Sequence, residues 1–230
     1  MARVSLRWSP RSSRETAIIG TPKWWATVAR VDIELDTSPA GCHNFVKVWR
    51  DEILATRPSL IVMASASSDY FIHDQHVRFR APDDDRWFGD DDNKGRLWRT
   101  GVASLLKPFS QAKIPVLLIH TLPHFLNWDL YQCPGTTVWT DVLDCGRVVP
   151  LAQIRRQQQL ATQAEDRAAT DVSEVTTVDL KPRLCPDKMC RTNVGPRWIM
   201  HDGGHITVGE ADLLEPAFEQ LVASHVRQTS

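Results

Sequence analysis

Two short apolar runs constrain the fold of this chain more than any other feature. Residues 59–65 read SLIVMAS and residues 114–121 read IPVLLIHT, and uninterrupted runs of this length are typical of parallel strands buried on both faces. Each run follows a segment with helical periodicity, and residues 175–180 (VTTVDL) are a third candidate strand. This alternation predicts an open α/β sheet covered by helices on both faces.

The helical segments carry apolar residues at three- and four-residue spacing. The inward face of residues 44–58 is predicted to consist of Phe45, Val48, Trp49 and Ile53. That of residues 96–113 is predicted to consist of Leu97, Val102, Leu105, Leu106 and Phe109. Arg57-Pro58 should end the first helix, and Pro108 should kink or shorten the second. Residues 152–170 are polar and helix-prone, which predicts one surface helix packed through Leu151, Ile154 and Leu160.

Charge and hydropathy exclude several classes of function. The net charge of -1 gives no electrostatic case for binding nucleic acid or an anionic membrane. No uninterrupted apolar segment approaches the roughly 20 residues that span a bilayer. Residues 1–20 are basic but lack the apolar core of a secretory signal. No repeat or linker is visible, so residues 1–230 are predicted to form one domain, and no cofactor is predicted.

Two Asp triplets lie in the stretch RAPDDDRWFGDDDNKG, at 80–95. They suggest calcium, but the stretch lacks the alternating Asp ligands and the terminal Glu of an EF-hand loop. We therefore interpret the stretch as an acidic loop exposed to solvent, without a calcium site.

The richest chemistry lies near the C-terminus, where His201-Asp202-Gly203-Gly204-His205 precedes a helix. Asp202 is close enough along the chain to accept the ring N–H of His205, which is the carboxylate–imidazole half of a nucleophilic triad. The two glycines would permit unusual backbone angles. One alternative is a polar loop that is exposed to solvent and has no catalytic role. A metal site of His201 and His205, with His120 and His124 as further ligands, is another.

A helix is predicted directly after this block. Thr207 and Glu210 have the spacing of a capping box, in which the Thr207 hydroxyl accepts the Glu210 N–H and the Glu210 carboxylate reaches back. Pro216 should bend the helix. Its buried face is predicted to consist of Leu214, Ala217, Phe218, Leu221 and Val222.

The cysteine count is five, so at least one thiol has no partner within the chain. Cys133 and Cys145, and likewise Cys185 and Cys190, bracket short loops. Either pair could be a disulfide of an oxidising compartment or two reduced thiols, and spacing alone leaves both open. Neither pair has the spacing of a zinc knuckle.

Residues 178–222, from VDLKPRLCPDKMC through MHDGGH to the capped helix, resemble the end of SGNH hydrolase domains. They are most similar to the extracytoplasmic SGNH domain fused behind membrane O-acyltransferases of bacterial cell-surface polymers. Residues 41–70 and 98–125 are similar to the earlier helix–strand segments of that domain. The resemblance thus runs from residue 41 onward, in the family's order.

The resemblance implies a three-layer α/β/α, flavodoxin-like parallel sheet of the SGNH hydrolase type. It implies that Asp202 is the triad acid and His205 the base, and that Cys133–Cys145 and Cys185–Cys190 are disulfides. The implied substrate is an O-acylated carbohydrate or glycan, and the implied partner is a membrane acyltransferase. The implied location is the extracytoplasmic cell envelope, whereas the chain would be cytoplasmic if it is complete as written.

Three departures from the family stand out. The family nucleophile lies in Gly-Asp-Ser at the end of the first strand, and that tripeptide is absent from this sequence. Because MARVSLRWSP resembles the residues that follow the serine, we hypothesise that the chain begins just downstream of the nucleophile. Residues 15–20 (ETAIIG) would then fill the gap in the sheet, or the protein would be unstable alone. Gly204 replaces a polar residue before the base, and Cys42 has no cysteine near residues 24–26 to pair with.

If a serine nucleophile is present, the expected chemistry is acyl transfer through a covalent acyl-serine. If no serine is present, the rate of ester hydrolysis should be near background. Ser65 is the nominated substitute nucleophile, ahead of Ser5 and Ser9. Gly41 and Ser65–Ser68 are nominated as oxyanion donors. One rival function is a non-catalytic glycan-binding or interaction module that uses Trp87 and Trp128. The other is a metal-dependent hydrolase that uses the histidines.

Overall fold

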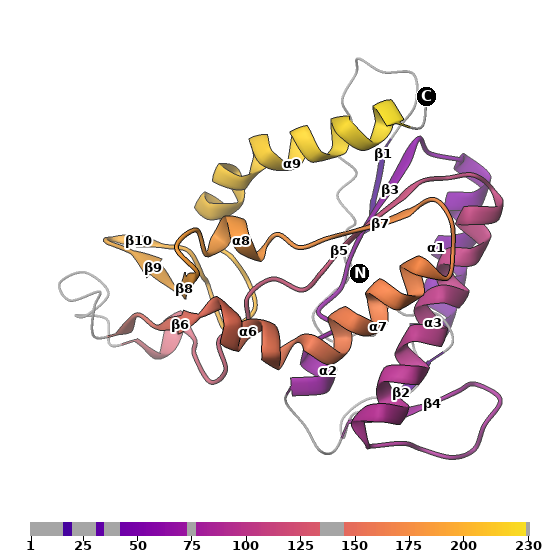
Figure 1. Cartoon of the computed structure of the whole chain (residues 1–230), viewed down its shortest axis with the longest axis horizontal. Helices are drawn as coiled ribbons and strands as arrows, with labels where there is room; N and C mark the ends of the chain where they lie inside the picture. The colour runs from indigo at the N-terminus through magenta and orange to yellow at the C-terminus, as the bar shows by residue number, and fades with distance from the viewer. Residues whose placement is uncertain (1–15, 20–30, 35–41, 73–76, 134–144, 229–230) are drawn as a thin grey trace. The chain divides into compact units, whose positions relative to one another are not determined.

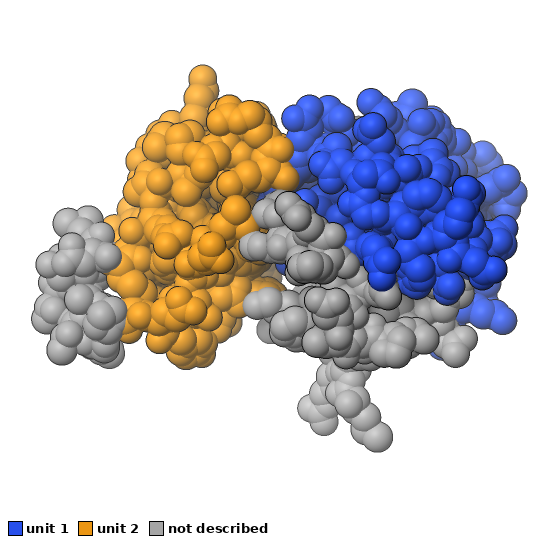
Figure 2. Space-filling view, turned by 90° about the horizontal axis from the view of Figure 1, so that it is seen from below, with its two compact units in different colours: residues 1–120, 158–178, 225–230 blue, residues 121–157, 179–224 orange. Residues whose placement is uncertain are grey.

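The computed structural model describes residues 16–19, 31–34, 42–72, 77–133 and 145–228, and the structural statements below concern these residues. The chain divides into two compact units, which Figure 2 distinguishes by colour. Unit 1 comprises residues 1–120, 158–178 and 225–230, and unit 2 comprises residues 121–157 and 179–224. Each unit is described by itself.

Unit 1 is built on a four-stranded parallel sheet (Figure 1). The strands, in their order across the sheet, are β1 (Thr16–Ile19), β3 (Leu60–Ala64), β5 (Val116–Ile119) and β7 (Val175–Val178). The three predicted strands are therefore confirmed. The segment expected to fill the gap in the sheet forms β1, which pairs with β3 from Thr16 opposite Leu60 to Ile19 opposite Met63.

Helices flank this sheet, as expected for the α/β/α class. They are α1 (Cys42–Thr56), α2 (Asp69–Ile72), α3 (Asp91–Gln111) and α7 (Gln159–Thr170). Unit 1 also contains a short antiparallel pair, β2 (Asp32–Glu34) with β4 (Arg78–Arg80). The apolar core joins side chains of α1, α3 and α7 to those of β3 and β5, so burial of the helix faces on the sheet stabilises the unit.

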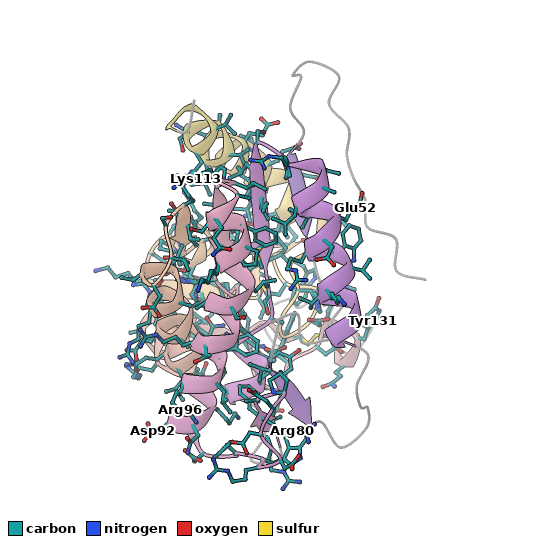
Figure 3. The ribbon with its side chains drawn as sticks, turned by 90° about the vertical axis from the view of Figure 1, so that its right-hand side faces the viewer. Glu52, Arg80, Asp92, Arg96, Lys113 and Tyr131 are labelled. Atoms are coloured by element: carbon teal, nitrogen blue, oxygen red, sulfur yellow. A yellow bond between two sulfur atoms is a disulfide. The ribbon has the colours of Figure 1, made fainter. Side chains whose placement is uncertain are left out.

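The buried face of α1 differs from the predicted one. Val46 and Ile53 are buried, whereas Val48 is 65% exposed, and Glu52 projects from the helix (Figure 3). Val46 and Ile53 lie seven residues apart and so share one face of the helix. The predicted face was therefore rotated, and the side chain of Phe45 lies outside the described residues.

α3 buries all five apolar residues predicted for it and runs through Pro108 to Gln111. The second Asp triplet explains where it begins. The Asp90 carboxylate accepts the backbone N–H of Asn93 at 3.0 Å, and Asp91 and Asp92 occupy the first turn, where negative charge favours the helix dipole. This triplet is thus a helix start within the stretch predicted to be a loop.

The segment 152–170 is two helices rather than one. α6 (Leu151–Gln157) belongs to unit 2 and α7 to unit 1. The helical structure is interrupted between them at Gln158, which is 1% exposed. α7 is not a polar surface helix, because Ala161, Ala164, Glu165 and Ala168 are buried. Small side chains let this face pack closely against α3.

Unit 2 is built from short elements around a second core. These are η1 (Leu130–Gln132), β6 (Val148–Pro150), α6, α8 (Lys181–Leu184), β8 (Met189–Arg191), β9 (Asn193–Val194), β10 (Arg197–Trp198) and most of α9 (Val208–Gln228). β6 pairs with β8 and β9 with β10, both antiparallel. Phe125, Trp128, Ile154, Leu184 and Met200 are among the buried core residues.

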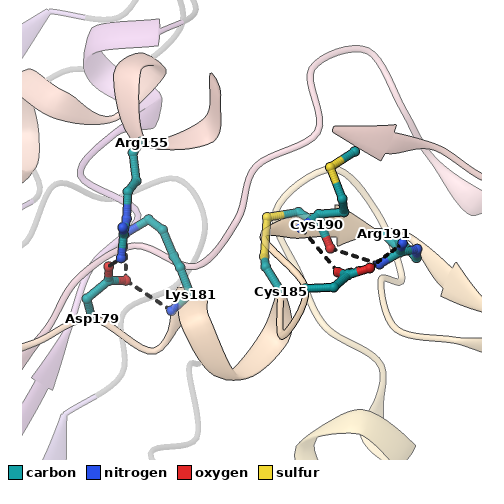
Figure 4. The surroundings of a disulfide bond; sticks show 8 residues. Arg155, Asp179, Lys181, Cys185, Cys190 and Arg191 are labelled. Atoms are coloured by element: carbon teal, nitrogen blue, oxygen red, sulfur yellow. Dashed lines mark hydrogen bonds and ion pairs between the residues drawn. A yellow bond between two sulfur atoms is a disulfide. The ribbon is translucent and has the colours of Figure 1, made fainter. Parts of the chain in front are cut away.

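Two disulfides join residues of unit 2, and they are the two pairs predicted. Cys133 is bonded to Cys145, and Cys185 to Cys190 (Figure 4). Closing loops of these lengths restricts the unfolded chain and stabilises the fold by about 2–3 kcal/mol each. For a unit made of two- to four-residue strands and short helices, such cross-links replace part of the stabilisation that a large core would give.

A buried lysine anchors the start of α8 in unit 2. Lys181 is 2% exposed, and its Nζ lies 3.2 Å from Oδ1 of Asp179, whose other oxygen accepts a hydrogen bond from Arg155 at 3.0 Å (Figure 4). Burial pushes the pKa of Asp179 upward, but the charge of Lys181 and the hydrogen bonds from Lys181 and Arg155 outweigh it. The pKa of Asp179 therefore lies below its ordinary value of 3.8.

Replacing Asp179 by Ala should lower the free energy of unfolding by about 2–3 kcal/mol, because a buried ammonium loses its carboxylate. In the wild type, a carboxyl with a depressed pKa stabilises the fold above its unfolded pKa, and this contribution should fade as the pH falls below about 4. Urea unfolding at pH 7 and pH 3 measures both effects. Asp187→Ala, which removes a 52% exposed partner of Arg191, is the control and should change the stability by less than about 1 kcal/mol. Equal losses in the two variants would contradict this account.

Candidate active site

A narrow backbone loop presents Asp202 and His205 in unit 2. Met200 and Ile206 form an antiparallel bridge, the His201 N–H donates to the His205 carbonyl at 2.7 Å, and the Thr207 N–H donates to the Ile199 carbonyl at 2.8 Å. These paired backbone bonds close the loop at its base. Asp202, Gly203 and Gly204 therefore lie at its tip.

Asp202 and His205 are in direct contact. Nδ1 of His205 lies 2.8 Å from both carboxylate oxygens of Asp202. Oδ1 of Asp202 also accepts the backbone N–H groups of Gly204 and His205, each at 2.9 Å. The carboxylate is 16% exposed and the imidazole 49%. The predicted carboxylate–imidazole contact is thus present. The carboxylate is held both by the imidazole ring and by two backbone N–H groups.

This arrangement selects one tautomer of the imidazole. A carboxylate only accepts hydrogen bonds, so Nδ1 carries the hydrogen and Nε2 is left as the acceptor. Among the described residues, no group hydrogen-bonds to Nε2 of His205. A half-exposed, basic Nε2 with its opposite nitrogen on a carboxylate is suited to taking a proton from a hydroxyl group.

The segment 125–129 lies against this loop and was not predicted to do so. The Phe125 N–H donates to the Gly203 carbonyl at 2.7 Å, and Asp129 forms an antiparallel bridge with Asp202. Phe125 and Trp128 are 2% and 7% exposed, so they anchor the segment in the core of unit 2. The apolar side chains that follow His124 were the available sequence signal for such a buried segment.

Gly203 is required for close packing rather than for an unusual backbone angle. A Cβ at this position would lie 2.6 Å from the Phe125 carbonyl oxygen and 3.2 Å from that of Trp128. Neither Gly203 nor Gly204 adopts a left-handed backbone, which corrects the expectation from the sequence. A Cβ on Gly204 would meet only the His124 ring, at an ordinary 3.6 Å.

The helix α9 begins directly after the loop, and half of its predicted capping box is present. The Thr207 hydroxyl accepts the Glu210 N–H at 3.2 Å and donates to the Trp198 carbonyl at 2.8 Å. The return contact is absent, because the Thr207 N–H is bonded to Ile199 and the Glu210 carboxylate lies 3.6 Å from Arg197. The cap ties the loop to β10 and so helps to fix its position.

The remaining nominated groups lie elsewhere. Ser65 follows β3 in unit 1 and Ser67 and Ser68 are buried there, whereas Asp202 and His205 belong to unit 2. Gly41, Ser5 and Ser9 lie outside the described residues, as does the side chain of Cys42. Ser65 therefore stays a prediction.

The histidines nominated for a metal have other neighbours, and the ring of His124 lies beside Gly203 and Gly204. His120 directly follows β5 in unit 1 and its Nε2 lies 3.1 Å from Oδ1 of Asp166, while His201 contacts the ring of Tyr131. Within the described part of the chain, no three His, Cys, Asp or Glu side chains are grouped so that they could hold a metal ion.

The two tryptophans nominated for glycan stacking are already engaged. Trp128 is 7% exposed, its ring lies 5.9 Å from that of Trp198, and its Nε1 donates to the Cys145 carbonyl at 2.8 Å. The Arg80 guanidinium lies 4.6 Å from the ring centre of Trp87. Trp128 is therefore a core residue, which corrects its nomination.

Comparison with protein families gives one match. The model described as "SGNH domain (fused to AT3 domains)" matches residues 17–220, a range that starts in β1 and ends in α9. Neither the curated proteins nor the solved structures gave a match. Among the described residues, no helix has both the length and the apolar character needed to cross a membrane.

Replacing Gly203 by Ala should lower the free energy of unfolding by about 1–3 kcal/mol, because the new Cβ forces the loop away from the Phe125 and Trp128 carbonyls. Gly204→Ala is the matched control, since its Cβ has room, and it should change the stability by less than about 1 kcal/mol. Urea unfolding of both variants provides the comparison. If Gly203→Ala is as stable as Gly204→Ala, the close packing of position 203 against the Phe125 and Trp128 carbonyls would be contradicted.

Proposed function

The chain belongs to the family of SGNH domains that are fused to AT3 domains, and on that basis we propose that it transfers acyl groups of O-acylated glycans, with Asp202 and His205 as acid and base. Membership establishes a hydrolase or acyltransferase type of fold. The observation that carries the finer proposal is the contact of Nδ1 of His205 with both Asp202 oxygens at 2.8 Å.

In the proposed step, His205 first accepts a proton and then donates it. Nε2 of His205 takes the proton of a hydroxyl group as its oxygen bonds to the acyl carbon of the ester. The imidazolium then returns the proton to the leaving sugar oxygen as the old carbon–oxygen bond breaks, which leaves an acyl-serine. Water or an acceptor hydroxyl then attacks the acyl carbon, with His205 taking its proton and returning it to the serine oxygen as the acyl–serine bond breaks. Asp202 stabilises the imidazolium without accepting its proton, and the N–H groups of Gly204 and His205 keep the carboxylate in position.

The identity of the nucleophile is the second part of the proposal. Among the described residues β1 is the first strand, and in the sequence Gly20-Thr21-Pro22 follows it, not Gly-Asp-Ser. Ser65, which directly follows the last residue of β3, remains the candidate for this hydroxyl. The chemistry needs such a hydroxyl within about 3 Å of Nε2 when the substrate is bound.

The proposed location is outside the cytoplasmic membrane, in the cell envelope, with a membrane acyltransferase as partner. Two disulfides support this location, because short-loop disulfides persist in oxidising compartments and are rare in the cytosol. The family's fusion to AT3 domains supports the partner.

A serine-directed fluorophosphonate tests the catalytic assignment. The wild type should be labelled at Ser65, and His205→Ala should reduce both the labelling rate and the hydrolysis of an O-acetylated oligosaccharide by about 10³-fold or more. Mass spectrometry locates the label, and Ser65→Ala should lose it. His225→Gln, a change on α9, is the control and should behave like the wild type. Absence of labelling in the wild type would refute the serine mechanism.

Thiol accessibility tests the location. In cells that produce the native protein, four of its five cysteines should resist a maleimide reagent after acid quenching and should react only after reduction. Mass spectrometry should show these four to be Cys133, Cys145, Cys185 and Cys190. Immediate reaction of all five would contradict an extracytoplasmic location.

A further inference from the structure

The aromatic ring of Tyr131 stands out in unit 2 because it is 79% exposed (labelled in Figure 3). Removing a large aromatic side chain from water is favourable, so an exposed ring that the backbone holds in place is a candidate for ligand binding. The other aromatic rings of this segment, Phe125 and Trp128, are buried. Tyr131 is therefore not simply part of an exposed polar loop.

The backbone holds Tyr131 in a fixed place. It is the central residue of the 3-10 turn η1, and its N–H donates to Oδ1 of Asp129 at 2.9 Å. The turn ends at Cys133, whose N–H donates to the Leu130 carbonyl at 3.0 Å and whose sulfur is bonded to Cys145. A cap on one side and a disulfide on the other reduce the conformational entropy that a ligand would have to remove.

Tyr131 also contacts the loop that carries Asp202 and His205. Its ring centre is 5.2 Å from that of His201, the residue before Asp202, at an interplanar angle of 86°. Asp129, two residues before Tyr131, forms the backbone bridge with Asp202. All of these residues belong to unit 2, so the proximity does not depend on the other unit.

The geometry of the ring pair leaves room for a ligand. Two perpendicular rings meet edge to face, so His201 occupies at most one face of Tyr131. The exposed fraction of 79% shows that most of the Tyr131 side chain is accessible. The structure thus provides an exposed aromatic ring in contact with the loop that carries the proposed acid–base pair.

We propose that Tyr131, held by His201, is a stacking platform for a sugar ring of the substrate. The proposal rests on the proposed function and specifies its substrate class. A sugar ring presents a face of C–H bonds with slightly positive hydrogens, which complements the negative face of an aromatic ring. An acyl chain would instead require an enclosed apolar pocket.

Calorimetric titration tests the platform with a probe that cannot be turned over. The probe is the oligosaccharide of the hydrolysis test after all of its ester groups have been removed. Tyr131→Ala should weaken its binding about 3- to 10-fold, and Tyr131→Phe, which keeps the ring, should stay within about twofold of the wild type. Val148→Ala removes part of another exposed apolar side chain of unit 2 and should leave the affinity unchanged. Circular dichroism should show the same fold for all four proteins.

Three outcomes would overturn the platform. They are no binding of the probe by the wild type, equal affinity of Tyr131→Ala and wild type, and an equal loss in Val148→Ala. A change in sedimentation of Tyr131→Ala without a change in sugar affinity would instead assign the ring to a protein contact, and would also overturn it. Because the probe carries no ester, these outcomes are separate from failure of the acyl-transfer proposal, which the His205→Ala variant decides.

Discussion

The candidate site depends on one constraint, the fixed position of the Asp202 carboxylate. Exposed ion pairs usually contribute little, because two flexible side chains must be held together in water. Here one carboxylate oxygen accepts two backbone N–H groups as well as the imidazole, so the loop itself orients it. Gly203 allows that loop to lie against the Phe125 and Trp128 carbonyls. The geometry of His205 is thus inherited from the backbone.

The parts of the fold that the sequence could predict are those determined by local chemistry. The strands β3 and β5 are apolar runs that only a buried position can satisfy, and Thr207 is a cap because its hydroxyl faces the first turn of α9. The Asp202–His205 contact belongs to the same class, because two residues that are three positions apart on one turn lie close together in space. Such features need no knowledge of distant segments.

The features that were mistaken or missed depend on tertiary packing. Val48 and Val46 are equally apolar, and only the position of the sheet decides which one is buried. The break at Gln158 separates two helices that pack in different units, although the sequence on either side is uniformly helix-prone. The role of Gly203 depends on Phe125, which is distant along the chain. Trp128 and Tyr131 are close neighbours, and only the fold shows that the first is buried and the second exposed.

The exposure of His205 bears on why the pair exists. A half-exposed imidazole on a surface loop adds little to stability, whereas in the same unit Asp179 is paired with a buried cation, the ammonium of Lys181. The loop nevertheless supplies two backbone donors, a close glycine contact and a helix cap around Asp202 and His205. This arrangement orients an accessible nitrogen and therefore supports the proposed chemistry at Nε2 of His205. That reasoning holds even though the sequence has no Gly-Asp-Ser, because it concerns the base and not the nucleophile.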